Sequence, residues 1–187
     1  MFVKNIVKTS AEYLGLKDVV KFLNSEVEAT EQVLEEIENF VLAVNMVNNN
    51  IASSYVELLS SAEVDKVGSL IKYTDITDKS IIEIKKIESY DGASLNFKLL
   101  PEGVVVEGAS SCVVEYSYFP TRVGIDDEIT HFLKVNELVF SLGVVGEYLY
   151  IKGAIDDAYM WDKRFKSSMF NLLRPRRNIE IPARRWE

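Results

Sequence analysis

The sequence is poor in the residues that build redox, metal and nucleophilic sites, with one cysteine and one histidine among 187 residues. A single cysteine cannot form a disulfide within the chain. Cys112 stands in an apolar, alternating stretch, which favours a buried and unreactive side chain. With His131 alone, histidine metal clusters and Ser-His-Asp triads have too few members, and a Cys-His pair would require Cys112 and His131 to meet. We therefore expect neither enzymatic activity nor redox chemistry.

Longer functional patterns are missing as well. The sequence contains no G-x-x-x-x-G-K-[ST] or G-x-G-x-x-G loop that would hold a phosphate. No apolar run approaches the ~18–20 residues that a membrane span needs. The N-terminal residues lack the apolar core and cleavage site of a secretory signal. We expect no cofactor and no membrane association, and a protein that works in cytosol-like conditions.

Positive charge is scarce in most of the chain and concentrated at its C-terminal end. Residues 163–187 contain eight Lys or Arg against two acids, whereas the other 162 residues contain 13 basic and 27 acidic side chains. A body of net charge −14 is therefore followed by a segment of net charge +6. This separation indicates that the C-terminal segment meets another surface.

Residues 175–187 are predicted to be an extended basic docking tail, because apolar and cationic side chains alternate there and Pro182 blocks a helix. Such a segment can add to an edge or groove through its backbone, while its arginines pair with carboxylates. Two other interpretations stay open: a tail that is disordered or folded back on the acidic body, and a grip on nucleic-acid phosphates, which the negative body opposes. The candidate protein-interaction residues are Arg174, Arg176, Arg177, Ile179, Ile181, Arg184, Arg185 and Trp186.

Hydrophobic periodicity predicts N-terminal helices over residues 1–69. A short helix is expected over roughly residues 10–23, followed by a longer one that opens at Ser25 or Thr30 and whose apolar stripe extends to Leu59. Asparagines interrupt the second half of this stripe and indicate a kink, a break or a polar contact with a neighbouring segment. They are Asn45, Asn48, Asn49 and Asn50.

From residue 70 the hydrophobic period changes to about two, which predicts a small antiparallel β-sheet inserted over residues 70–120. A hairpin is expected around the turn at Asp91-Gly92. Two further strands should follow the turns at residues 101–103 and 108–111. Four strands would then form one sheet, and the flanking helices are the nearest cover for its apolar face.

Residues 121–174 are predicted to form a C-terminal helical hairpin that completes the helical bundle. Acids at 126–128 indicate the start of its first helix, although together with His131 they are also suitable ligands for a divalent cation. Gly143 and Gly146 lie inside this helix and indicate that another backbone packs closely against it. The expected fold class is α+β: a bundle of N- and C-terminal helices with an inserted small antiparallel β-sheet and an extended C-terminal tail.

Three stretches carry patterns of residue type that together span nearly the whole chain. They are Val47-Asn-Asn-Asn-Ile-Ala-Ser-Ser-Tyr55-Val-Glu-Leu58; Val114-Glu-Tyr-Ser-Tyr118-Phe-Pro120 with the acidic turn 126–128; and Glu147-Tyr148 through Trp161-Asp-Lys-Arg164-Phe165, leading to the basic end 181–186. In these stretches the sequence resembles the head-to-tail adaptor (neck or connector) proteins of tailed bacteriophages. The patterns are diffuse compared with a nucleotide loop or a metal signature.

The resemblance implies a virion structural protein without catalytic activity. Adaptors of this family pair two groups of helices with a small β-sheet and form a ring, commonly of twelve copies, beneath the portal of the capsid. The implied partners are the portal protein, a further neck or tail protein and identical copies in the ring, with DNA passing through the channel without specific binding. The implied location is the neck of the virion, after assembly in the host cytoplasm. The C-terminal tail, through Arg184, Arg185 and Trp186, would then dock on the portal.

A second hypothesis belongs to another class of function. The same basic tail could serve a non-enzymatic regulatory binding module that contacts nucleic acid or an acidic partner. Salt-sensitive DNA binding that disappears when residues 174–187 are removed would favour this hypothesis over the adaptor.

Overall fold

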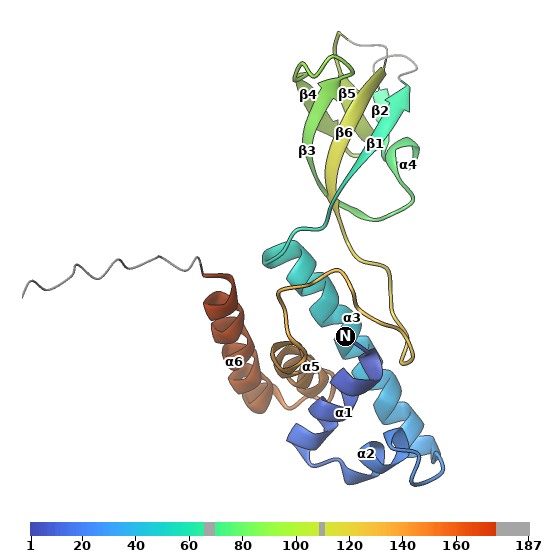
Figure 1. The fold of residues 1–187 in the computed structure, drawn as a ribbon, viewed down its shortest axis with the longest axis vertical. Helices are drawn as coiled ribbons and strands as arrows, with labels where there is room; N and C mark the ends of the chain where they lie inside the picture. Colours follow the sequence, from blue (N-terminus) through green and yellow to red (C-terminus); the bar gives the residue numbers. More distant parts are fainter. Residues whose placement is uncertain (66–69, 109–110, 175–187) are drawn as a thin grey trace, which may run out of the picture.

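The structure, a computed structural model, describes residues 1–65, 70–108 and 111–174 and has an α+β fold. Helices from both ends of the chain form one body, and a β module stands at one end of it (Figure 1). The elements are α1 (Val3–Leu14), α2 (Lys17–Leu23), α3 (Glu31–Ser54), β1 (Leu59–Asp65), β2 (Leu70–Lys72), α4 (Tyr73–Ile76), β3 (Ile81–Ser89), β4 (Phe97–Leu100), β5 (Gly103–Val106), β6 (Ser111–Tyr118), α5 (Glu137–Ile151) and α6 (Ile155–Leu173).

Helix α5 occupies the centre of the body and contacts α1, α3 and α6. Its sequence is apolar on nearly every side, which is typical of a helix surrounded by other helices. The predicted close approach of another backbone is confirmed at Gly146, whereas Gly143 packs closely against side chains. A side chain at Gly143 would come within 3.1 Å of Phe165 and of Val47, and one at Gly146 within 3.3 Å of the backbone nitrogen of Asp162 in α6.

The N-terminal helices differ from the prediction in two places. The single short helix predicted over residues 10–23 is wrong: the structure has α1 and α2, because Gly15 adopts a left-handed conformation (φ 70°) and ends α1. The long helix begins as predicted, with the Thr30 hydroxyl accepting a hydrogen bond from the Val33 amide. It ends at Ser54, however, and the following residues pair with another strand.

The β module contains two three-stranded antiparallel sheets, ordered β1-β6-β3 and β2-β5-β4. The prediction of one four-stranded sheet covered by helices is therefore wrong. The two sheets bury their apolar faces on each other, so the module has its own core and needs no helical cover. That core includes Val64, Ile71, Ile84, Ile87, Val104, Val106, Cys112 and Val114.

The boundary predicted between residues 69 and 70 is also wrong, since the first strand already begins at Leu59. Leu58 and Leu59 continue the apolar spacing of α3, but pairing of β1 with β6 outweighs that local pattern. The turn at Asp91-Gly92 exists, with Gly92 at φ 83°, yet β3 and β4 pair with different strands. The predicted hairpin is reduced to a single bridge between Glu88 and Ser94.

The acidic turn at 126–128 does not begin a helix, which corrects another prediction. Helix α5 starts nine residues after Glu128, at Glu137, where the Asn136 side chain caps it by accepting the Val139 amide. Glu128 instead forms an isolated β-bridge with Phe2, and the Asp127 carboxylate accepts the Gly124 amide at 2.6 Å. These residues thus join the loop before α5 to the start of α1.

Candidate protein-interaction site

Of the eight candidate interaction residues, the structure describes Arg174 alone. Arg174 is exposed and caps the C-terminal end of α6, where its amide donates to the Phe170 carbonyl at 3.0 Å. The other seven lie outside the described residues: Arg176, Arg177, Ile179, Ile181, Arg184, Arg185 and Trp186. The structure therefore shows the point at which the basic tail leaves the body.

The packing of α6 against the core fixes the position of its C-terminal end. Ala158, Phe165 and Met169 are buried along the face of α6 that meets the core. These three positions follow one another at helical spacing, which is typical of a helix with one buried face. The absence of a side chain at Gly146 lets the backbone of α6 approach α5 closely. Because these side chains anchor α6, the C-terminal end of the helix at Arg174 has a defined position on the body.

The opposite face of α6 is apolar, basic and exposed. Ile155, Tyr159, Met160 and Phe170 lie away from the core, and Phe170 is 67% exposed. Lys163, Arg164 and Lys166 share the exposed side of the helix. The charge count already separated these cations from the acidic body, but the apolar residues beside them were missed. These apolar residues occupy helix positions outside the buried stripe, and that position in the sequence could have identified them as exposed.

Helix α3 carries a surface of opposite charge. Its solvent-facing side combines Leu34, Leu42 and Met46, each 40–48% exposed, with the carboxylates of Glu31, Glu35 and Glu38, and α3 contains no Lys or Arg. A fourth acid, Glu36, is turned towards the core instead. Its carboxylate accepts the hydroxyl of Tyr148 at 2.5 Å and an ammonium hydrogen of Lys152 at 3.1 Å. Burial, together with Glu36, raises the pKa of Tyr148.

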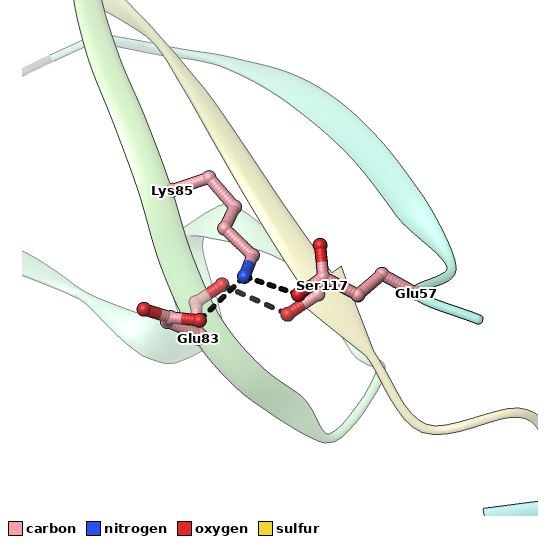
Figure 2. Close-up of polar contacts among 4 residues, drawn as sticks. All are labelled: Glu57, Glu83, Lys85 and Ser117. Carbon is pink, nitrogen blue, oxygen red and sulfur yellow. Dashed lines mark hydrogen bonds and ion pairs between the residues drawn. The ribbon is translucent and has the colours of Figure 1, made fainter. Parts of the chain in front are cut away.

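A polar cluster lies where the β module joins the helical body. Figure 2 shows the ammonium group of Lys85, on β3, between the carboxylates of Glu57 and Glu83, at 2.6 and 2.5 Å. Glu57 belongs to the segment that connects α3 to β1, and the Ser117 hydroxyl donates to the Glu83 carbonyl at 3.4 Å. The hydrogen bond to Glu57, with that to Glu83, raises the pKa of Lys85. The cluster therefore ties the connecting segment to the outer surface of the module.

The residues weighed for catalysis or metal binding lie apart. Cys112 is fully buried in the β core, whereas His131 lies in the body, with its Nε2 2.9 Å from the side-chain Oδ1 of Asn48. Burial lowers the pKa of His131. The polar contact predicted from the asparagines is thereby found for Asn48, and Asn45 likewise bonds the Val123 backbone. Within residues 1–65, 70–108 and 111–174, no group of three His, Cys, Asp or Glu side chains could hold a metal ion.

Comparisons with known proteins do not assign the chain to a family. No protein-family model and no curated protein matches the sequence. In the part of the chain that the structure describes, no helix is both long and apolar enough to cross a membrane.

Proposed function

We propose that this protein is a virion structural protein, a head-to-tail adaptor that forms a ring beneath the portal and joins the capsid to the tail. The observation that carries the proposal is the charge division of the chain: residues 1–162 have a net charge of −14, and residues 163–187, which begin within α6, have a net charge of +6. The α+β arrangement, with helices from both ends of the chain and an inserted β module, supports the same family resemblance.

In this proposal, the C-terminal tail docks on the portal. Arginine side chains pair with carboxylates through paired hydrogen bonds, and tryptophan and arginine are favoured anchors at protein interfaces. Arg184, Arg185 and Trp186 are the proposed contacts with the portal, and identical copies, commonly twelve, complete the ring. The acidic body would let DNA pass through the channel without specific binding, because like charges repel. A further neck or tail protein is the partner on the other side, in the neck of the virion after assembly in the host cytoplasm.

The direct test compares the full chain with a chain ending at Arg174 in co-sedimentation with purified portal rings. The shortened chain should remain folded, because the described core ends before residue 175, and it should fail to join the portal. The triple change Arg184→Ala, Arg185→Ala and Trp186→Ala should have the same effect. A double change in the exposed module, Lys98→Ala with Glu102→Ala, is the matched control that should bind normally.

Portal binding by the shortened chain at full strength would refute the docking role of the tail. DNA binding that weakens with salt and disappears in the shortened chain would instead support a regulatory module that contacts nucleic acid. Electron microscopy of the bound complex then shows whether the copies form a closed ring and how many it contains.

A further inference from the structure

Two exposed helix surfaces of the body are complementary in character. The α6 surface is formed by Ile155, Tyr159, Met160 and Phe170 with the cations Lys163, Arg164 and Lys166; the α3 surface is formed by Leu34, Leu42 and Met46 with the carboxylates Glu31, Glu35 and Glu38. The α6 surface has its cations in the second half of the helix, and the α3 surface has its carboxylates in the first half, in each case on a helix with large exposed apolar side chains. Exposed apolar clusters of this kind mark surfaces that meet a partner.

The α6 surface is mainly basic in its second half. The exposed acids of α6, Asp156 and Asp157, lie in its first turn, where they favour the helix N-terminus. Asp162 forms an ion pair with Lys166, four residues later in the helix, at 2.7 Å. An ion pair of this kind on a helix surface contributes little to stability. Lys163 and Arg164 are exposed on the same helix, and the Arg164 guanidinium lies over the Trp161 ring, 5.0 Å from its centroid.

The α3 surface is acidic in its first half and apolar in the middle. Beside Leu42, the chain between β6 and α5 borders a groove lined by Val41, Val123 and Ile125. Arg122 and Glu38 line the groove as well. The groove offers an apolar recess to a side chain of the size of Phe170, next to a row of carboxylates.

The two surfaces cannot meet within one molecule. Both α3 and α6 direct their buried residues into the same core and pack on α5, which lies between them (Figure 1). Their exposed faces therefore point away from that core in different directions. A contact between two different surfaces of identical chains is heterologous, and it produces a closed ring or an open filament according to the rotation between neighbours.

We infer that the α6 surface of one copy binds the α3 surface of the next copy, with Lys163, Arg164 and Lys166 facing Glu31, Glu35 and Glu38. Charge complementarity selects the second copy as the occupant of both surfaces. This inference rests on the proposed function, because it assigns the surfaces through which neighbouring copies in the proposed ring would bind each other. The contact itself needs neither the C-terminal tail nor the portal.

Charge reversal tests the pairing. One variant carries Glu35→Lys and Glu38→Lys on α3, and a second carries Lys163→Glu and Arg164→Glu on α6. In sedimentation velocity and native mass spectrometry, the wild-type chain is expected to associate as its concentration rises. Each variant alone should associate at least about a hundredfold more weakly, because two like-charge contacts cost several kcal/mol.

The decisive result is recovery on mixing. When both variants are combined, every α6 surface can meet an α3 surface of opposite charge, so association should return, with the two variants alternating. The chain carrying all four changes should also associate with itself. Lys98→Glu with Lys72→Glu, at exposed positions of the module, is the matched control and should behave as wild type. Folding of each variant is checked by its helical circular dichroism.

Three outcomes would overturn the inference: a wild-type chain that stays monomeric at millimolar concentration, single variants that associate as wild type does, or a mixture that does not recover. These outcomes are separable from failure of the adaptor function. Portal binding through the tail is measured independently with the chain ending at Arg174, so rings that form normally from both variants would refute the assigned surfaces and leave the adaptor proposal standing.

Discussion

The helical body and the β module bury side chains in different ways. Among the described residues, the helical core contains 23 buried apolar side chains and the β core contains ten. The body includes large aromatic residues such as Phe40, Phe140 and Phe165, whereas the module is built mainly from valine and isoleucine. The helical body therefore gains more stability from its core than the β module does, because buried apolar area is the main stabilising contribution to folding.

The connection between the two regions is narrow. The chain crosses from body to module through residues 55–58 and returns at residue 119. The two crossings lie side by side, since the Tyr118 amide donates to the Leu58 carbonyl at 3.1 Å. Ile82 and Tyr118 are the residues of the strands that pack against the helical core. The comparison therefore predicts that damage to one core stays largely within that core.

The largest expected effect comes from Phe165→Ala in the body. Phe165 is 2% exposed and contacts Tyr55 edge-to-face, with ring centroids 5.9 Å apart. Its removal should lower the free energy of unfolding of the body by about 3–5 kcal/mol, because it loses buried area and leaves a cavity. Hydrogen exchange measured by mass spectrometry should speed up in α5 and α6 and change little in β3 and β6. Equal loss of protection in both regions would show that the two cores form one cooperative unit.

A smaller effect, confined to the module, is expected for Gly103→Ala. Gly103 faces Lys72 in the pairing of β2 with β5, and an added side chain would lie 2.1 Å from the Ile71 carbonyl oxygen. The backbone must shift to relieve this clash, which should cost about 1–3 kcal/mol of module stability. Hydrogen exchange of β2 and β5 is the measurement, with Glu102→Ala as the neighbouring control. Unchanged protection of these strands would contradict the packing described for the module.

His131 should make the stability of the body depend on pH. Burial lowers the pKa of His131 below its ordinary value of 6.5, so the unfolded chain binds more protons than the folded chain between the two values. Its contribution to stability is complete above pH 6.5 and is lost as pH falls towards the folded pKa. Denaturant unfolding between pH 7 and pH 5 should therefore show a decline that is smaller in His131→Gln. An equal decline in the two proteins would exclude this histidine as its source.

The smallest effect is expected at the junction, for Lys85→Met. Ion pairs at the surface contribute little, since water and salt screen them. Loss of the contact between Lys85 and Glu57 should slightly increase hydrogen exchange in the segment joining α3 to β1, and 0.5 M salt should abolish the difference. Lys98→Met, on exposed β4, is the matched control. A large change that persists in high salt would mean that this cluster fixes the module on the body.

Features that depend on interactions between neighbouring residues could be predicted from the amino-acid sequence. The Thr30 cap, the inward stripe of α6, the burial of Cys112 and the close helix contact at Gly143 and Gly146 follow from local hydrogen bonding, side-chain period and the missing side chain of glycine. The charge division of the chain also follows from the sequence, because net charge depends on composition alone.

The contacts between distant segments could not be predicted in the same way. The pairing of β1 with β6, the separation of β3 and β4 into two sheets, and the use of Glu128 as a bridge to Phe2 join residues far apart in the chain, where local periodicity carries no information about partners. The same holds for the exposed faces of α3 and α6. Which side of a helix is left uncovered depends on the helices packed against it, and here α5 covers the inner face of both.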